Sequence, residues 1–468
     1  MYRSTRGGVE VTSMEAILNG LAPNGGLYVP GELPKLDYKG LLNDSYVIMA
    51  SKLLKAFFPE FSYEELKSEV KEAYKSFDIE EVVRLKECGD AYFLELFHGP
   101  TLAFKDLALV VLPRLMRLSS KRLGYERKLT ILTATSGDTG GAALNGFKGV
   151  DGINIIVLYP NNGVSRVQEA QMHSFKSDNS RVYAVNGNFD SCQSFVKEFF
   201  NKHKELSLSS ANSINIGRLV PQVVYYFYSY ISLVKRKAIA LDEKINFSVP
   251  TGNFGNIFAA FLAKNMGLPI NSLICASNKN DVLTDYFKTG SYDINREFYK
   301  TNSPSMDIII SSNLERLLYY ANNMDSLRVN ELMKNLKDNK KYLFKCPYDY
   351  FYGYMANEEK TLRTIREVYD SFGYLIDPHT AVAYSAYMDY KEELKDGLKT
   401  IVVSTASPFK FPKSIKEAFN LASDSLEAIK NKFNLEIPKC LNYQEYQKEV
   451  LDIKDLESFI LGVEKCLE

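Results

Sequence analysis

One lysine, Lys105, lies in a largely apolar stretch at residues 98–106, just before the apolar run 107–112. Burial disfavours the charged form of a lysine, so an amine in such surroundings loses its proton more easily. A neutral amine can form a Schiff base with an aldehyde cofactor such as pyridoxal 5'-phosphate (PLP). The alternative for this segment alone is an amphipathic helix whose lysine extends its charged end to solvent.

Residues 133–141 follow an apolar run and are rich in glycine and hydroxyl side chains. Glycines permit a sharp turn at the start of a helix, where free backbone N–H groups attract an anion. Thr135, Ser136 and Thr139 add hydroxyl donors. The alternative is a capped turn that binds no ligand. A Walker A loop is excluded, because no Gly-Lys-Ser/Thr sequence ends the segment.

A second glycine-rich turn, residues 250–256, follows another apolar run and precedes a helical pattern at 257–264. Its backbone amides could surround a phosphate, or the segment is simply a tight turn. The residues that would form this site are Gly252, Asn253, Phe254, Gly255 and Asn256.

A third polar segment, residues 211–218, has the pattern of a helix start. Asn212 or Ser213 is predicted to cap a helix, with Arg218 over one turn into it. A guanidinium with polar neighbours suits a phosphate, whereas a capped helix with a surface arginine is the alternative. The tyrosines at 225–230 fit core or interface packing better than a cofactor site.

Two later segments end the set of candidate sites. Thr405 follows the apolar run 400–404, and open α/β sheets bind ligands at the ends of such strands. His379, in the segment 377–383, fits a structural histidine better than a catalytic one, so we leave it out of the predicted catalytic residues.

Composition excludes several classes of function. The 468 residues carry 57 Lys and Arg and 57 Asp and Glu, so net charge indicates neither a nucleic-acid partner nor an anionic membrane. Residues 1–8 lack the apolar core of a signal peptide, and no apolar run approaches the length of a membrane span. The six cysteines show no metal-ligand spacing, so we expect a cytoplasmic protein with reduced thiols and no metal.

Short apolar runs alternate with helical patterns from about residue 92, and each run ends near glycine, asparagine or serine. This pattern is typical of a buried parallel sheet with crossover helices. The predicted strands are 129–135, 153–159, 182–185, 246–249, 273–276 and 400–404. We therefore predict an α/β fold.

The chain divides into three predicted parts. Residues 1–91 form a helical N-terminal region, in which residues 62–65 begin a charged amphipathic helix. Residues 92–425 form an α/β domain, and residues 426–468 a charged helical tail without visible chemistry. Residues 280–350 are expected to be a polar, irregular elaboration of the core.

These segments together resemble the threonine synthases, a family of PLP enzymes of fold type II. The resemblance extends from residues 4–8 to 408–411 and includes 301–308, which looks like a threonine-synthase segment and is not general to fold type II. It implies two open, mostly parallel α/β subdomains, of which the smaller and mobile one lies at about 130–210.

The resemblance also implies a role for each candidate residue in holding the cofactor. Lys105 would carry PLP as a Schiff base, residues 252–256 would hold its phosphate, and Thr405 would bond its pyridine nitrogen. Asp138 would contact the phenolic oxygen. Because an ionised aspartate cannot donate a hydrogen bond, Asp138 would have to take up a proton or act through its backbone.

For the substrate, the resemblance implies two further sites. The loop with Thr135, Ser136 and Thr139 would bind the substrate carboxylate. Asn212, Ser213 and Arg218 would hold the substrate phosphate.

The implied reaction converts O-phospho-L-homoserine and water to L-threonine and phosphate, the last step of threonine biosynthesis, in a monomer or homodimer. It proceeds by PLP-dependent γ-elimination of phosphate and β-addition of water. Another fold-type II activity, such as a threonine/serine dehydratase or a phosphohomoserine lyase, is one alternative. A catalytically silent binding protein is a second alternative, which the intact Lys105 disfavours.

Overall fold

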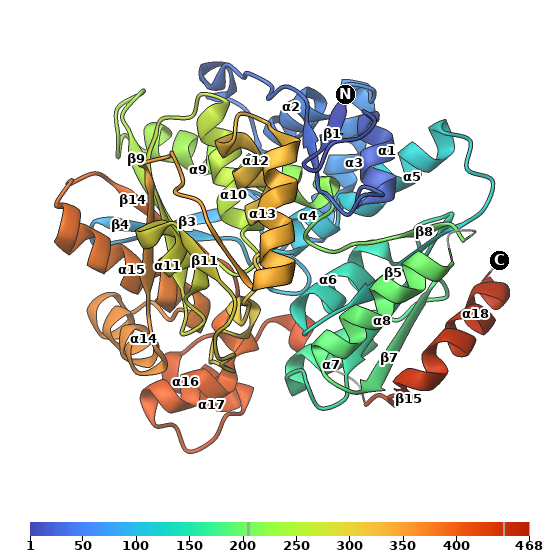
Figure 1. The fold of residues 1–468 in the computed structure, drawn as a ribbon. Helices are drawn as coiled ribbons and strands as arrows, with labels where there is room; N and C mark the ends of the chain where they lie inside the picture. The colour runs from blue at the N-terminus through green and yellow to red at the C-terminus, as the bar shows by residue number, and fades with distance from the viewer. Residues whose placement is uncertain (204–205, 443–444, 468) are drawn as a thin grey trace.

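Two larger sheets form the framework of the protein (Figure 1). The computed structural model describes residues 1–203, 206–442 and 445–467. The strands of the six-stranded sheet are β3 (Arg84–Cys88), β4 (Ala91–Glu95), β9 (Ile245–Pro250), β10 (Ile270–Ser277), β13 (Phe351–Met355) and β14 (Thr400–Ser404). Their order is β13-β10-β9-β14-β4-β3, and all neighbours are parallel except the pair β3 and β4.

The second, five-stranded sheet is smaller and parallel throughout. Its strands are β5 (Leu129–Ala134), β6 (Ile153–Pro160), β7 (Ser180–Asn186), β8 (Leu208–Ser209) and β15 (Val450–Asp452), in the order β15-β7-β6-β5-β8. Central strands such as β5, β6 and β9 are buried at every position, which explains why their sequences read as continuous apolar runs. All six predicted strands are present, and the predicted α/β fold with two mostly parallel sheets is confirmed.

Helices cover the sheets and join their strands (Figure 1). Those around the larger sheet are α4 (Asp106–Leu109), α9 (Ile216–Lys235), α10 (Gly255–Asn265), α14 (Glu358–Phe372), α15 (Pro378–Leu394) and α16 (Pro412–Phe419). Those around or leading into the smaller sheet are α5 (Leu112–Arg122), α6 (Asp138–Phe147), α7 (Arg166–Ser174) and α8 (Phe189–Lys202).

The N-terminal region is helical, with one short antiparallel strand pair. Its elements are β1 (Tyr2–Ser4), α1 (Ser13–Asn19), β2 (Tyr28–Pro30), α2 (Tyr46–Phe57) and α3 (Tyr63–Ala73). Helix α3 begins where the sequence predicts it, because Ser62 and Glu65 form a reciprocal capping box.

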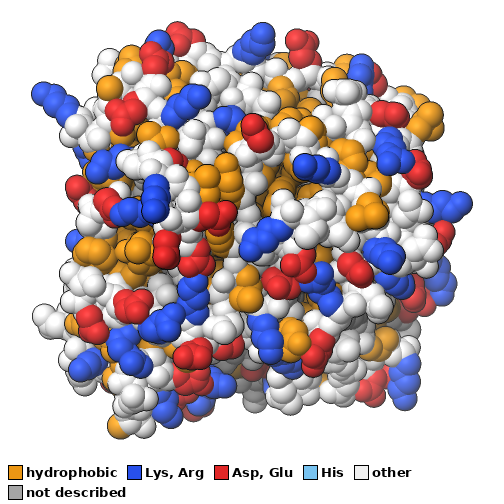
Figure 2. Space-filling model, turned by 60° about the vertical axis from the view of Figure 1, so that its left-hand side comes forward, with side chains coloured by type: hydrophobic (Ala, Val, Ile, Leu, Met, Phe, Trp, Pro, Cys, Tyr) orange, Lys and Arg blue, Asp and Glu red, His pale blue; other side chains and the backbone are white. Residues whose placement is uncertain are grey.

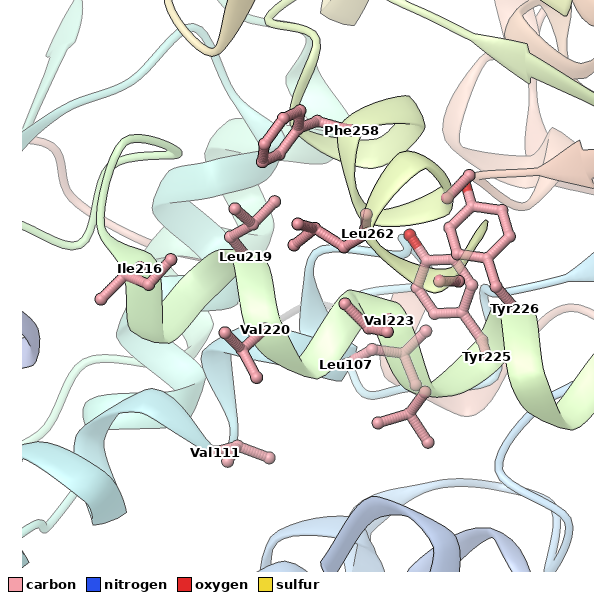
Figure 3. Close-up of a cluster of buried hydrophobic side chains, with 14 of the residues drawn as sticks. Leu107, Val111, Ile216, Leu219, Val220, Val223, Tyr225, Tyr226, Phe258 and Leu262 are labelled. Atoms are coloured by element: carbon pink, nitrogen blue, oxygen red, sulfur yellow. The ribbon is translucent and has the colours of Figure 1, made fainter. Parts of the chain in front are cut away.

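Helix α9 lies at the centre of the molecule and is buried along most of its length. Figure 3 shows Leu219 and Val223 of α9 packed with Leu107 of α4 and with Phe258 and Leu262 of α10. Because apolar packing in a core leaves few voids, α9 fixes α4 and α10 relative to each other. These two helices follow the segments that contain Lys105 and the 250–256 turn.

Residues 280–350 are more regular than the sequence predicted. They contain α11 (Val282–Thr289), β11 (Ser291–Asp293), α12 (Leu314–Ala321), α13 (Ser326–Asn339) and β12 (Lys341–Leu343). The expectation of an irregular segment is therefore wrong. Charged and polar residues stand between the buried positions Leu317, Leu318 and Leu332, and in α12 the charged Glu315 and Arg316 are themselves buried, so the apolar pattern of these helices was obscured.

The tail also differs from its prediction. It contains the helices α17 (Leu426–Phe433) and α18 (Leu456–Leu467), but between them β15 extends the smaller sheet by pairing with β7. Figure 1 shows α18 alongside this sheet. The tail is therefore not purely helical, and its three-residue strand was too short to leave an alternating pattern.

The surface in Figure 2 carries acidic and basic side chains interspersed over the whole visible face. Among the described residues, no helix is long and apolar enough to cross a membrane. Within the same residues, no group of three or more His, Cys, Asp or Glu side chains is arranged to hold a metal ion.

Candidate active site

The candidate site lies at the carboxyl ends of the parallel strands β4, β9 and β14 of the larger sheet. The segments that follow these strands contain Lys105, the 250–256 turn and Thr405. The backbone N–H of Phe104 donates to the carbonyl of Thr405 at 2.8 Å, so the first and last of these segments are joined directly. Open α/β sheets place ligands at this edge.

Lys105 is nearly buried, with 14% of its side chain exposed. Its Nζ donates to Ser305 Oγ at 3.4 Å and lies 3.7 Å from Asp138 Oδ2. Burial lowers the pKa of Lys105 to about 8, although the Asp138 carboxylate opposes this shift. The ammonium form of Lys105 therefore still predominates at neutral pH, but the neutral, nucleophilic fraction is far larger than that of an ordinary lysine.

Asp138 is the first residue of α6 and the main polar contact of the smaller sheet with the larger one. Lys410 Nζ contacts Asp138 Oδ1 at 2.7 Å, and Gln168 Nε2 donates to the same oxygen at 3.0 Å. Ser305 Oγ donates to Asp138 Oδ2 at 3.2 Å. Burial alone would raise the pKa of Asp138, but Lys410 and Lys105 outweigh burial and hold the pKa well below its usual range. Asp138 is therefore ionised, which disfavours the expectation that it takes up a proton.

Lys410 was not among the predicted site residues. Its side chain is fully buried, and its ammonium also donates to the Thr101 carbonyl at 2.8 Å and to Gln171 Oε1 at 3.0 Å. Three acceptors satisfy the three protons of the ammonium group. The signal that could have identified Lys410 is a lysine within the otherwise apolar segment 408–411.

The 250–256 turn has the geometry of a phosphate cradle. Phe254 has φ +65°, in the left-handed region, and turns the chain into the N-terminus of α10. A Cβ atom at Gly252 would lie 2.8 Å from the Ser305 carbonyl oxygen, so this position requires glycine. Tyr225 and Tyr226 both donate to Asn256 Oδ1, at 2.5 and 2.6 Å. The tyrosines thus lie in the core, as predicted, and also fix one residue of the turn.

The third segment begins a helix at a different residue from the one predicted. Asn215 caps α9 by accepting from the N–H of Gly217, so the prediction that Asn212 or Ser213 caps the helix is wrong. Arg218 consequently lies in the first turn of α9 rather than beyond it. Asn212 instead accepts from Thr133 Oγ1 at 2.9 Å, which joins this segment to β5 of the smaller sheet.

Arg218 is 3% exposed, and its Nη1 donates to the Ala211 carbonyl at 2.8 Å. Burial lowers its pKa to about 10, so it remains a cation at neutral pH. Its Nε is buried without a partner among the described residues, as is the side-chain nitrogen of Asn256. Buried donors without acceptors are rare in native proteins, so both positions suit an anionic ligand.

The hydroxyls of the 133–141 segment have different surroundings. Thr135 Oγ1 accepts from the N–H groups of Gly137 and Gly140 at 3.0 and 2.9 Å, so it stabilises the turn. Ser136 is exposed and Thr139 half-buried. Of the predicted substrate donors in this loop, Ser136 and Thr139 therefore remain the more accessible.

Ser305 is a second residue that the sequence analysis did not assign to the site. It lies in the segment 301–308, which the family resemblance singled out but to which no role was given. Its hydroxyl contacts both Lys105 and Asp138. Nothing in the spacing of residues 301–308 from Lys105 could place them together, because the contact spans 200 positions.

Comparison with known proteins shows three consecutive family matches. A family model described as pyridoxal-phosphate dependent enzyme matches residues 78–406, the threonine synthase N terminus matches 1–74, and the threonine synthase C-terminal model matches 380–460. The chain is 38% identical to threonine synthase of Schizosaccharomyces pombe, with 90% of each chain covered. It is 38% identical to threonine synthase of Pseudomonas aeruginosa, with 89% of this chain and 90% of that one covered.

Solved structures give the same result. A PLP-bound threonine synthase from Brucella melitensis matches with a TM-score of 0.87 and 39% identity, over 98% of both chains. Threonine synthase from yeast matches with a TM-score of 0.90 and 33% identity, over 100% of this chain and 99% of that one. The chain therefore belongs to the threonine synthase family of pyridoxal-phosphate dependent enzymes.

Proposed function

We propose that this enzyme converts O-phospho-L-homoserine and water to L-threonine and phosphate. The observation that carries the proposal is a nearly buried lysine amine, Lys105, in a site that also contains two separate sets of buried anion donors. A cofactor phosphate and a substrate phosphate require two such sets. A dehydratase acting on serine or threonine would need only one.

The residues present fit PLP. Lys105 supplies the amine for the aldehyde, and the turn formed by Gly252, Asn253, Phe254, Gly255 and Asn256 offers backbone N–H groups at the start of α10 for the phosphate. Thr405 ends β14 at the same edge and supplies a hydroxyl for the pyridine nitrogen. When bound, PLP supplies an electron sink for the substrate carbons.

We assign the substrate phosphate to Arg218 together with Asn212 and Ser213. The buried guanidinium keeps its charge and has a donor without a partner, so it can hold a dianionic leaving group by charge-assisted hydrogen bonds. The loop with Thr135, Ser136 and Thr139 would hold the substrate carboxylate, with Ser136 as the accessible donor.

Lys105 is also the base of the proposed mechanism. With the substrate bound, its neutral amine would take the proton from Cα of the substrate, a transfer favoured by a pKa of about 8. Asp138, ionised and held by Lys410, stabilises positive charge on that amine afterwards. Arg218 stabilises the charge that grows on the departing phosphate.

The division of the chain remains part of the proposal. We propose a threonine-synthase N-terminal region at 1–91, a catalytic domain at 92–425 and a tail at 426–468. The smaller subdomain at about 130–210 would close over the substrate and exclude bulk water, so that water adds at one carbon only. We further propose a monomer or homodimer that acts in the cytoplasm.

The test is incubation of the purified enzyme with O-phospho-L-homoserine, with phosphate, threonine and 2-oxobutyrate measured together. We expect threonine and phosphate in equal amounts. Phosphate with 2-oxobutyrate in place of threonine would establish the alternative, a phosphohomoserine lyase that releases an oxo acid, and the absence of all three products from PLP-loaded protein would refute the proposal.

A further inference from the structure

The segment 301–308 is tied into a closed loop at the carboxyl end of β10. Thr301 donates through its N–H and its hydroxyl to Asp307, at 3.0 and 2.7 Å. Asn278, just after β10, donates to Thr301 Oγ1 and to Asp307 Oδ1, both at 2.8 Å. The turn at the tip of this loop, Pro304–Met306, is therefore held in place by the larger sheet.

Ser305 at this tip has a defined hydrogen-bond direction. The ionised Asp138 can only accept, so the Ser305 hydroxyl donates its proton to Asp138 Oδ2. Its oxygen lone pairs then face Lys105, whose Nζ donates to Ser305 Oγ at 3.4 Å. Asp138 thus makes Ser305 an acceptor toward the Lys105 amine.

His379 holds the backbone of Ser305. The Ser305 N–H donates to His379 Nε2 at 3.2 Å, and His379 Nδ1 lies 2.8 Å from Asp377 Oδ1. A backbone N–H cannot accept, so Nε2 carries no proton and Nδ1–H donates to Asp377. His379 is 2% exposed and Asp377 0%, so this arrangement is shielded from solvent.

We propose that Ser305 is a further catalytic residue, which holds the Lys105 amine in a fixed orientation, and that His379 is a positioning residue acting through Ser305. Ser305 Oγ holds one N–H of the amine, and the Asp138 carboxylate 3.7 Å away favours the second N–H on its side, so the nitrogen lone pair has one preferred direction for taking a proton. The inference rests on the proposed function for the identity of that proton, which is the one on Cα of the substrate. The contacts that orient the amine involve only residues of this chain.

The first test measures the Lys105 amine without substrate or turnover. The full chain, freed of PLP, is methylated with formaldehyde and a mild hydride donor across a pH range, and modification of Lys105 is followed by mass spectrometry. The inflection for the unaltered chain is expected near pH 8. Because the Ser305 oxygen favours the ammonium form, Ser305→Ala should move the inflection down by about half a unit or more.

Two variants control this measurement. Ser305→Thr retains the hydroxyl and should keep the inflection of the unaltered chain. Ser303→Ala alters a buried serine of the same loop that does not contact Lys105, and it should also leave the inflection unchanged. An inflection that Ser305→Ala leaves unchanged or raises, or that Ser303→Ala lowers equally, would overturn the proposal.

The second test uses the PLP-loaded enzyme. Ser305→Ala should lower kcat by about tenfold or more with little change in KM or PLP content, since it disorients a base rather than a binding group. His379→Leu should lower kcat similarly, and the double variant should be no worse than either single one, because both act through one contact. Additive losses would remove His379 from the proposal, and an unchanged kcat in Ser305→Ala would remove Ser305. If the unaltered enzyme makes no threonine, the proposed function fails, whereas the methylation result still stands.

Discussion

The two larger sheets contribute to the site in different ways. The six-stranded sheet presents three strand ends, and the segments after them contain Lys105, the 250–256 turn and Thr405. The five-stranded sheet reaches the same place mainly through the turn after β5, where Asp138 contacts Lys105, Lys410 and Ser305. The larger sheet therefore provides most of the site, and the smaller one adds the charged Asp138 and the loop with Ser136 and Thr139.

This difference indicates that the two sheets have different roles in cofactor binding and in substrate turnover. A cradle built from backbone amides suits a cofactor that stays bound, whereas the smaller sheet, which contributes the charged Asp138, is the part that we propose to move as substrate enters and leaves. Changes in the larger sheet should therefore affect PLP retention. Changes at the junction of the sheets should affect stability and substrate turnover, and the following variants test that contrast.

The largest effect is expected at Lys105, whose amine contacts Ser305 beside the larger sheet and Asp138 beside the smaller one. Lys105→Ala removes the covalent attachment and the base together, and such paired roles cost many orders of magnitude in rate. The protein should still fold, as judged by circular dichroism, and threonine formation should fall to background. Substantial threonine formation by the folded variant would show that Lys105 is not the catalytic lysine.

Lys410→Met tests the charged contact between the sheets. It leaves the buried Asp138 carboxylate without its closest partner, which should lower the free energy of unfolding by about 3–5 kcal/mol. Because the folded state depresses the pKa of Asp138, this contribution is present above roughly pH 4 and is lost as the pH falls further. Urea unfolding at neutral and acid pH measures both effects.

The matched control is the double variant Lys410→Met with Asp138→Asn. It removes the charge as well as its partner, so it should regain most of the lost stability. A double variant no more stable than Lys410→Met would mean that the unpaired Asp138 charge is not the cause of the lost stability.

Arg218→Ala tests the separation of the two anion sites. The variant should retain PLP, because the cofactor phosphate is assigned to the 250–256 turn, but kcat/KM should fall by an amount equivalent to about 2–5 kcal/mol. Part of the loss should appear in kcat, since charge grows on the leaving phosphate. The measurement is PLP content together with steady-state kinetics. Loss of PLP with full activity in the remaining holoenzyme would reverse the assignment of the two phosphates to the two sites.

The smallest change in rate is expected from Thr405→Asp, in the part of the site that the larger sheet provides. A carboxylate there favours a protonated pyridine ring, so side reactions such as transamination should rise relative to threonine formation by roughly several-fold. The absorbance spectrum and product ratio report the effect. An unchanged spectrum and ratio with normal PLP binding would show that Thr405 does not contact the ring nitrogen.

Much of the fold could be predicted because it depends on local patterns. The strands β5, β6 and β9 are buried on both faces, so their apolar runs are unambiguous. The strand β15 could not be predicted, since it has three residues and is stabilised only by a partner far away in the sequence. The helix α12 also escaped prediction, because its charged residues Glu315 and Arg316 are buried and are satisfied by Arg6 and the Tyr28 carbonyl, which lie far away in the sequence.

The site was predictable where a single segment supplies the chemistry. Lys105 and the 250–256 turn could be singled out as candidates from residue types and their order, and the family resemblance implied their roles. Lys410 and Ser305 act through contacts that only tertiary structure creates, and the capping residue of α9 was misassigned because Asn212, Ser213 and Asn215 are all good caps. Local propensity does not choose among such neighbours, whereas the packing of α9 does.

The pairing of β15 with β7 has a consequence for how the protein forms during synthesis. Asn186 at the end of β7 bonds Asp452 in β15, 266 positions later in the chain. On the ribosome, β7 therefore remains an open sheet edge until almost the entire polypeptide has been made. Such an edge can pair with another nascent chain. The last strand thus covers β7 and leaves an edge of only three residues, whereas a chain released before residue 450 would leave the longer edge of β7 exposed to aggregation.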